Sequence, residues 1–199
     1  MPVRLTEQPD RVAGSAPSAA EEEREWIRRA QAGERAAYSK LVGRYQGRLY
    51  RFILRMVGTR EEALELSQDV FIKAWQALPQ WTPGAAFHTW LFRIGSNAAM
   101  DALRRRKVVE FTALDPQYDA VSGNPGPEAQ LESKQRLRAL EAALAWLPPE
   151  QREALLLREV EGLSYAELSA VLGVNEGTVK SRLARARTAL AARFENADA

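Results

Sequence analysis

The 199-residue sequence contains no cysteine and a single histidine, His88. Without thiols the chain can form neither a disulfide framework nor a thiolate metal site, and one imidazole is too few for a histidine-based zinc centre. We therefore expect no metal site and no cofactor, and we expect His88 to be a surface residue. A cysteine-free chain also suits the reducing cytoplasm, where we expect the protein to act.

Long hydrophobic runs are also missing. No segment approaches the roughly 18 consecutive apolar residues that a membrane-spanning helix needs, so we expect no membrane insertion. The sequence also lacks a Gly-rich phosphate loop, a nucleophile motif and a carboxylate pair in a recognisable catalytic context. We therefore expect a protein that is not an enzyme.

Charge of either sign is not in excess, because 28 Lys and Arg nearly balance 26 Asp and Glu. The overall charge therefore says little about a polyanionic partner, and the positions of the charges matter more. Apolar residues recur at helical spacing, and no strand pattern occurs. We predict an all-α protein made of two small helical domains joined by a flexible linker, the second domain carrying a helix-turn-helix.

The domain boundaries follow the places where helical periodicity begins and stops. Residues 1–20 contain almost nothing large to bury and are predicted to form a disordered arm. Residues 21–107 form the first helical domain. Proline and glycine interrupt residues 108–127, the predicted linker, and periodicity returns over residues 128–195, the second domain.

Local signals predict where helices begin and how closely they pack. Two capping boxes, Thr59 with Glu62 and Ser164 with Glu167, each mark the start of a helix. Gly95 lies in the middle of a predicted helix, where glycine costs about 1 kcal/mol of helix propensity. This cost indicates close packing or a local bend at Gly95.

Residues 164–187 have the pattern of a helix-turn-helix. Gly173 ends the first helix, because glycine adopts a positive φ without steric cost, and Asn175 caps the second helix two residues later. Short and basic side chains share the exposed face of the second helix, whereas a merely solvated face would usually contain more acidic residues. We predict that this helix enters the major groove of DNA, with contacts from Glu176, Thr178, Lys180, Ser181, Arg182, Arg185 and Arg187.

The motifs on both sides of the linker resemble those of one family. The runs "LELSQDVFIKAWQAL" and "FHTWLFRIGSNAAMDALRRRK" resemble domain two of the bacterial RNA polymerase sigma factors of the extracytoplasmic-function group, and "LPPEQREALLLREVEGLSYAELSAVLGVNEGTVKSRLARAR" resembles their domain four. The resemblance implies a sigma factor that binds core RNA polymerase through the beta-prime clamp helices and the beta flap. It also implies promoter choice through promoter DNA, with the helix-turn-helix at the minus-thirty-five element, and control by an anti-sigma factor. The chain departs from the family pattern at Glu34, Tyr38, Ser67 and Gly95.

The resemblance assigns roles to residues of the first domain. In the family, the helix that matches "LSQDVFIKAW" docks on the polymerase. We expect Phe71 and Trp75 to serve the domain core instead, because large aromatic side chains are usually buried. The expected polymerase contacts are the polar positions of this helix, Gln68, Asp69, Lys73 and Gln76.

The helix that begins near Phe87 and the loop before it capture, in this family, the non-template strand of the minus-ten element. Trp81 offers a ring on which a base can stack, and Asn97 offers a donor and an acceptor to a base edge. Two simpler explanations remain: Trp81 is buried in the domain, and Asn97 pairs with Arg93 or Asp101. The expected minus-ten contacts are Trp81, Arg93, Asn97, Arg104, Arg105, Arg106 and Lys107.

Two other functions are alternatives to a sigma factor. An autonomous helix-turn-helix regulator would need a ligand-sensing or phosphoacceptor domain, and residues 26–107 have the pattern of neither. A sigma-like interaction protein could sequester anti-sigma factors without binding DNA. The basic residues present in both DNA-facing helices argue against this second alternative.

Overall fold

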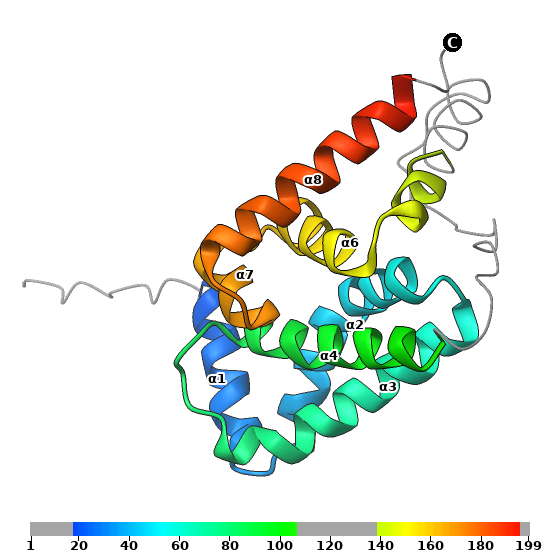
Figure 1. The fold of residues 1–199 in the computed structure, drawn as a ribbon. Helices are drawn as coiled ribbons and strands as arrows, with labels where there is room; N and C mark the ends of the chain where they lie inside the picture. Colours follow the sequence, from blue (N-terminus) through cyan, green and yellow to red (C-terminus); the bar gives the residue numbers. More distant parts are fainter. Residues whose placement is uncertain (1–17, 107–138, 196–199) are drawn as a thin grey trace, which may run out of the picture.

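The computed structural model describes residues 18–106 and 139–195, with side chains described as far as residue 193, and every regular element in these ranges is helical (Figure 1). The all-α prediction is therefore confirmed. The predicted linker and Lys107 lie outside the described residues, as does nearly all of the predicted arm. Residues 18–106 are called domain two below, and residues 139–195 are called domain four.

Domain two is a bundle of four helices. The first helix begins inside the predicted arm, because Ser18 and Glu21 form a capping box that the sequence analysis missed. Large apolar side chains on the inner faces of the helices, among them Leu49, Phe52 and Phe92, are almost completely buried. The elements are α1 (Ala19–Gln31), α2 (Arg35–Val57), α3 (Arg60–Ala77), the 3-10 turn η1 (Leu78–Gln80) and α4 (Phe87–Arg106).

Gly95 lies where α4 packs closely on α2. A Cβ atom at Gly95 would lie 2.7 Å from Leu49 Cδ1, which is too close for two carbon atoms, and 4.0 Å from Ile53 Cδ1. Leu49 and Ile53 are both fully buried. Of the two explanations for this glycine, close packing is therefore the correct one.

The N-terminus of α3 lacks the predicted capping hydrogen bond. Thr59 is the N-cap residue, but its side chain makes no capping hydrogen bond to the helix. Instead, Arg106 at the end of α4 donates to Thr59 Oγ1 at 3.3 Å and to the Glu62 carboxylate. The capping box predicted from Thr59 and Glu62 is thus wrong, because a charged guanidinium is a stronger partner for both oxygens than a backbone amide.

Domain four contains the predicted helix-turn-helix. Ser164 and Glu167 form the predicted capping box, and Gly173 follows the first helix with a φ of 65°. Asn175 Oδ1 accepts a hydrogen bond of 2.8 Å from the Thr178 amide, which confirms Asn175 as the cap of the second helix. The helical segments are residues 139–146, α6 (Pro149–Leu155), the π-helical turn η2 (Leu156–Val160), α7 (Tyr165–Leu172) and α8 (Glu176–Glu195).

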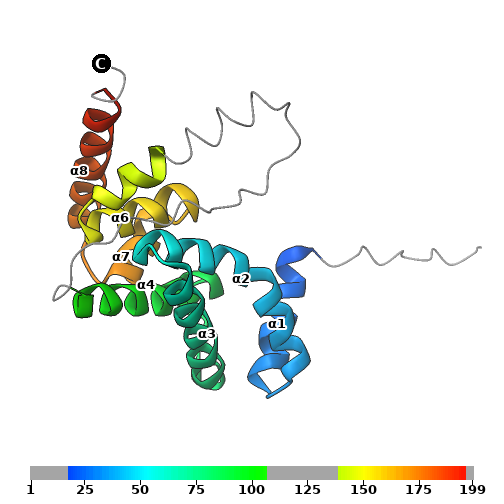
Figure 2. The same ribbon diagram turned by 90° about the vertical axis from the view of Figure 1, so that its right-hand side faces the viewer.

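The two domains lie in contact, with α6 and α7 stacked over α2 and α4 and with α8 packed on α6 and α7, as Figures 1 and 2 show from two directions. Helices α1 and α3 extend away from domain four on the opposite side (Figure 2). One cluster of buried apolar residues includes members of both domains, among them Leu91 and Leu168. Among the helices described here, none is both long and apolar enough to cross a membrane.

Candidate nucleic-acid interface

The second helix of the helix-turn-helix, α8, buries one narrow stripe and exposes the rest. Val179, Leu183 and Ala186 are fully buried and Leu190 is partly buried, at the spacing of one face of a helix. On the other faces, the side chains of Glu176, Lys180, Arg185 and Arg187 are exposed, and those of Thr178, Ser181 and Arg182 are partly exposed.

The basic side chains of α8 differ in whether they already form ion pairs or ring contacts within the protein. Arg187 forms an ion pair of 2.6 Å with Glu159. Lys180 Nζ lies 4.0 Å from the Glu176 carboxylate and 5.5 Å from the centre of the Tyr165 ring. Arg185 is exposed and, in the part of the chain that the structure describes, makes no hydrogen bond or ion pair. Arg185 is therefore the cation most available to a base edge or a phosphate.

A pocket of about 500 Å³ lies between the loop after α3 and the first turns of α4. Its aromatic walls are Trp81 and Trp90, and Arg93 supplies a cation at its edge. Aromatic rings beside a cation suit a stacked base next to its phosphate. Ala170 and Val171 of α7 form part of the lining, so domain four reaches this pocket.

Trp81 is partly buried, so it is neither fully buried in the domain nor fully exposed to a base. Its ring centre is 6.0 Å from that of Phe87 and 5.8 Å from that of Trp90. The Trp81 carbonyl accepts a hydrogen bond of 2.7 Å from Gln31 Nε2, which ties the loop to α1. Trp81 therefore packs against the domain on one side and contributes to the pocket on the other.

The structure does not pair Asn97 with the polar side chains one turn away on α4. Arg93 and Asn97 are exposed, and no hydrogen bond among the described residues joins Asn97 to Arg93 or Asp101. Asp101 pairs instead with Arg104, at 3.0 Å. The amide of Asn97 is thus free to meet a base edge, and the exposed Arg105 is a further candidate for phosphate contact.

Arg106 contributes to the fold rather than to an exposed basic surface. Its guanidinium donates to the Val57 carbonyl at 2.5 Å, to Thr59 and to Glu62, and so joins the end of α4 to the α2–α3 turn. These partners leave Arg106 less available for the predicted minus-ten contact than its exposed neighbour Arg105. Its spacing in the run of basic residues could not show this, because its partners lie more than 40 residues away in the sequence.

The four predicted polymerase contacts on α3, Gln68, Asp69, Lys73 and Gln76, are all exposed. Sequence analysis missed two apolar residues on this helix, Leu64 and Ile72, whose side chains are 54% and 56% exposed. Their spacing with Gln68, at i, i+4 and i+8, places all three on one face of α3. Large exposed apolar side chains at helical spacing are the signal that could have identified them.

A shallow groove of about 430 Å³ runs between α2 and α3 beside this face, lined by Tyr38, Ile72 and Trp75 among others. Phe71 and Trp75 are partly buried, and they pack against the core as expected. The Trp75 ring lies 4.8 Å from that of Tyr38, whose hydroxyl donates to the Phe71 carbonyl at 2.6 Å.

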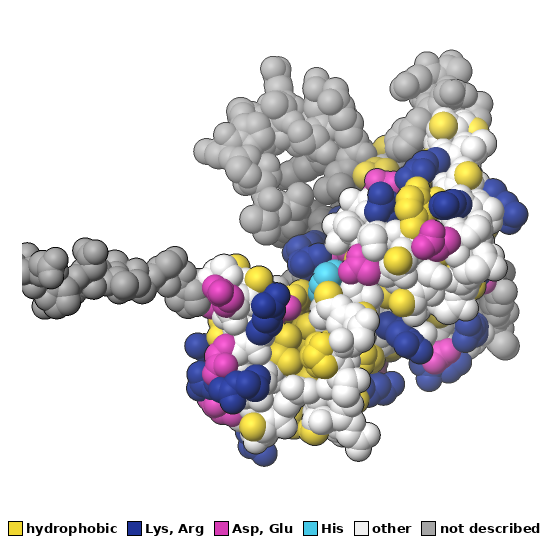
Figure 3. Space-filling view, turned by 90° about the vertical axis from the view of Figure 1, so that its left-hand side faces the viewer, with side chains coloured by type: hydrophobic (Ala, Val, Ile, Leu, Met, Phe, Trp, Pro, Cys, Tyr) yellow, Lys and Arg dark blue, Asp and Glu magenta, His cyan; other side chains and the backbone are white. Residues whose placement is uncertain are grey.

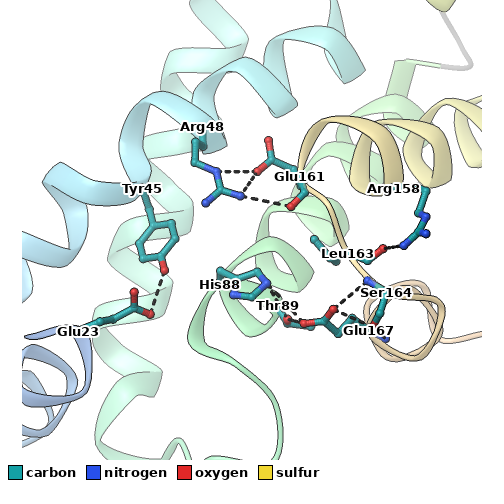
Figure 4. Close-up of polar contacts among 10 residues, drawn as sticks. All are labelled: Glu23, Tyr45, Arg48, His88, Thr89, Arg158, Glu161, Leu163, Ser164 and Glu167. Carbon is teal, nitrogen blue, oxygen red and sulfur yellow. Dashed lines mark hydrogen bonds and ion pairs between the residues drawn. The ribbon is translucent and has the colours of Figure 1, made fainter. Parts of the chain in front are cut away.

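Three glutamates of domain four face polar groups of domain two across the domain contact, and we call them the interdomain glutamates: Glu153, Glu161 and Glu167 (Figure 4 shows the last two). Arg48 Nε donates to Glu161 Oε2 at 2.9 Å, and Thr89 Oγ1 donates to Glu167 Oε1 at 2.8 Å. The Ser96 hydroxyl donates to Glu153. Sequence spacing could not reveal these pairs, since their members are at least 57 residues apart.

Burial shifts the proton affinities of these carboxyl groups. It raises the pKa of Glu153 to about 7, although the Ser96 hydrogen bond opposes the shift. Burial also raises the pKa of Glu161, against the opposing charge of Arg48. For Glu167, burial acts in the same direction, but the hydrogen bonds from Ser164 and Thr89 outweigh it and lower the pKa.

His88 is not simply a surface residue. Its Nε2 lies 3.5 Å from Glu167 Oε1, at the contact between α4 and α7. Figure 3 shows the single histidine at the boundary between the two lobes, with hydrophobic side chains gathered beside it on domain two. Within residues 18–106 and 139–195, no three His, Asp or Glu side chains gather as a metal site would require.

Two family models match the chain, one in each helical region. The family described as "Sigma-70 region 2" matches residues 41–108, and "Sigma-70, region 4" matches residues 137–190. A relative in Mycolicibacterium smegmatis, "ECF RNA polymerase sigma factor SigE", is 42% identical over 163 residues, which cover 79% of this chain and 63% of that protein. The chain thus spans less than two thirds of the length of this relative.

Two further comparisons cover nearly the whole of the similar chain. "RNA polymerase sigma-H factor" of Pseudomonas aeruginosa is 35% identical over 178 residues, which cover 85% of this chain and 92% of that protein. The sigma factor RpoE of Bartonella quintana, solved with the anti-sigma factor NepR, is 27% identical with a TM-score of 0.67 and covers 79% of this chain and 96% of that one. The chain therefore belongs to the extracytoplasmic-function family of RNA polymerase sigma factors, the subunits that direct the polymerase to promoters at transcription initiation.

Proposed function

We propose that the two domains divide promoter recognition between them, with α8 at the minus-thirty-five element and α4 with its preceding loop at the minus-ten element. The observation that carries the proposal is the pair of surfaces described above. One is an exposed helix of short and basic side chains, and the other is an aromatic pocket with a cation at its edge. The first suits a duplex groove, and the second suits an unpaired base.

At the minus-thirty-five element, we assign the central contacts to Lys180, Ser181 and Arg185. We assign Arg185 to a guanine, because a guanidinium can donate to two acceptors of that base's edge in the major groove. Arg187 has to leave Glu159 before it can bind phosphate, so we assign it a smaller share of the affinity. Glu176, Thr178 and Arg182 complete the proposed surface.

At the minus-ten element, Trp81 and Asn97 hold the displaced strand. A base that leaves the duplex stacks on the Trp81 ring, and Asn97 distinguishes one base edge from another. Arg93, Arg104 and Arg105 neutralise the phosphates of the same strand. Lys107 remains part of the proposal, although it lies outside the described residues.

The exposed face of α3 is the proposed docking surface for the clamp helices of core RNA polymerase. Gln68, Asp69, Lys73 and Gln76 supply hydrogen bonds there, and Ile72 supplies apolar contact. For the beta flap, we propose the surface around Trp146, whose side chain is 71% exposed and whose ring centre lies 4.4 Å from the Arg193 guanidinium.

An anti-sigma factor is the proposed negative regulator. The similar sigma factor of Bartonella quintana was solved in complex with one, and that chain and this one share their fold over most of their length. Purification from uninduced host cells should recover a stoichiometric partner. A sigma factor that is recovered alone under all such conditions would contradict this part of the proposal.

A reconstitution with core RNA polymerase tests the promoter proposal. We expect the chain to co-sediment with core polymerase and to direct run-off transcription from a subset of host promoter fragments. The variant Arg185→Ala should lose that selectivity while still binding the polymerase. An autonomous regulator would instead give a sequence-specific footprint without polymerase, and a sequestering protein would support no transcription.

A further inference from the structure

We infer that Gln31, the last residue of α1, is a positioning residue for strand capture. Its side-chain amide holds the loop that carries Trp81, so that the ring is already in place when a base leaves the duplex. The inference rests on the proposed minus-ten site and adds to it a residue from another helix. Gln31 lies outside residues 41–108, the part of domain two that the family model matches.

Gln31 binds both ends of the 3-10 turn that precedes the loop. Its Nε2 atom donates to the Trp81 carbonyl at 2.7 Å and to the Leu78 carbonyl at 3.2 Å. The Trp81 amide itself donates to the Leu78 carbonyl at 3.1 Å, which closes η1 from within. Among the residues that the structure describes, no other side chain donates a hydrogen bond to the backbone of residues 78–86.

The chemistry of these two bonds requires an amide at position 31. A backbone carbonyl can only accept a hydrogen bond, so the group that faces both carbonyls must have two hydrogens to donate. The NH₂ group of glutamine has them at the end of an uncharged side chain. A glutamate of the same size would place carboxylate oxygens against carbonyl oxygens, and a methionine of similar length would donate nothing.

The backbone that carries Gln31 is itself held in place. Ile27 and Ala30 on the same helix are buried in the core of domain two. The Gly33 amide donates to the Ala30 carbonyl at 3.0 Å, and Gly33 has a φ of 90°, a conformation that glycine adopts without steric cost. The end of α1 is therefore a fixed point from which the Gln31 side chain reaches the loop.

Trp81 is held at its ring as well as at its backbone. The ring meets Phe87 edge to face, with ring centres 6.0 Å apart, and its centre lies 5.8 Å from that of Trp90. Residues 82–86, which follow Trp81, are all exposed, so they contribute little packing that could hold the ring. The Gln31 amide is thus the polar anchor of Trp81 on the side of the loop away from α4.

An anchored ring binds a base more tightly than a ring that the base has to order. Fixing a free backbone costs conformational entropy, and a loop that is already ordered does not pay this cost again when the strand binds. Without Gln31, the carbonyls of Leu78 and Trp81 turn to water and the strand has to order the loop. The loss then falls on the stacked base and not on the phosphates, which bind elsewhere.

Abasic substitution in the DNA can measure that loss separately from overall affinity. The chain is bound to core polymerase and titrated with fluorescein-labelled non-template oligonucleotides that span the minus-ten element of a promoter it transcribes. Each base in turn is replaced by an abasic site, and the resulting ratio of dissociation constants is the abasic penalty. In the unaltered chain, the penalty should be about tenfold at the base that stacks on Trp81, and Trp81→Ala should abolish it.

Gln31→Met removes both donated hydrogens while keeping the length and the helix propensity of the side chain. We expect it to reduce the abasic penalty from about tenfold to about twofold, with the same affinity for the abasic oligonucleotide. The matched control is Gln46→Met at an exposed position of α2, which should keep the full penalty. Gln31→Glu should abolish the penalty, and Gln46→Glu controls for its charge.

The outcomes separate positioning from folding. A full penalty in Gln31→Met would overturn the inference. So would equal weakening of the intact and abasic oligonucleotides, or a loss of polymerase affinity that Gln46→Met does not share, because each would show that Gln31 serves only the fold. A full penalty in Trp81→Ala would instead overturn the proposed minus-ten contact of Trp81, and the inference with it.

Discussion

At Gly95, the packing of α4 on α2 requires a residue that is unfavourable for helix formation. Replacing Gly95 by Ala gains about 1 kcal/mol of helix propensity but places a methyl group 2.7 Å from the buried Leu49 Cδ1. Overpacking of this kind costs about 1–3 kcal/mol. We expect Gly95→Ala to lower the free energy of unfolding by about 1 kcal/mol in a urea titration.

Gly43 provides the control for this substitution. It lies exposed in the same bundle, on α2, with nothing within 4 Å of the position that a Cβ atom would take. Gly43→Ala should therefore stabilise the chain by up to about 1 kcal/mol. If both alanines stabilise equally, α4 and α2 are less tightly packed than the structure indicates.

A single substitution at Asn97 tests whether its side-chain amide binds the displaced strand of the minus-ten element. Because Asn97 is exposed, Asn97→Ala should leave the melting temperature and the polymerase affinity unchanged. Transcription from a duplex promoter should fall and should largely recover on a template that is already melted, since the lost contact forms only after the bases separate. An unchanged deficit on the melted template would instead place Asn97 outside promoter opening.

At the scale of elements, Arg106 connects three helices, and its neighbour Arg105 does not. Arg106→Ala removes hydrogen bonds from a charged donor to Val57, Thr59 and Glu62. We expect a loss of about 2 kcal/mol in the free energy of unfolding. Arg105→Ala should leave stability unchanged and weaken promoter binding, most clearly at low salt. A reversal of these two effects would return Arg106 to the DNA surface.

Elements whose signals are local could be predicted from the sequence, and contacts between distant elements could not. The helix-turn-helix was predictable because Ser164, Gly173 and Asn175 each act within a few residues of their own position. The Thr59 capping box failed for the opposite reason, because its competitor Arg106 is 47 residues away. The interdomain glutamates had no local signal, since an isolated glutamate on a helix is most often simply solvated.

For the whole molecule, docking of the domains should depend on pH. Burial raises the pKa of Glu153 from 4.5 to about 7 in the docked state, so this state binds a proton more tightly than the open one. The charged groups that act on Glu153 are Arg182 on α8, Arg104 on α4 and Glu150 on α6. Burial raises the pKa of Glu161 too, whereas the hydrogen bonds from Ser164 and Thr89 lower the pKa of Glu167.

The pKa shifts of Glu153 and Glu161 both favour docking at low pH, and the lowered pKa of Glu167 opposes them. The contribution of Glu153 is fully present below about pH 4.5 and is lost as the pH rises through about 7, with a magnitude on the order of 3 kcal/mol at most. Energy transfer between labels on the two domains should therefore fall between about pH 6 and 8. Glu153→Gln, which stays neutral, should flatten that dependence. A profile that is the same in both proteins would show that another group titrates.

The apolar cluster that continues from domain two into domain four has a consequence for heat denaturation. Two domains that share buried side chains, such as Leu91 and Leu168, melt as a single cooperative unit. Calorimetry of the free chain should then show one endotherm whose van't Hoff enthalpy equals the calorimetric enthalpy. Replacing both Glu161 and Glu167 by Gln should split it in two, because the bonds of both carboxylates to the other domain are weakened. Each domain thus owes part of its resistance to heat to the apolar side chains of its neighbour.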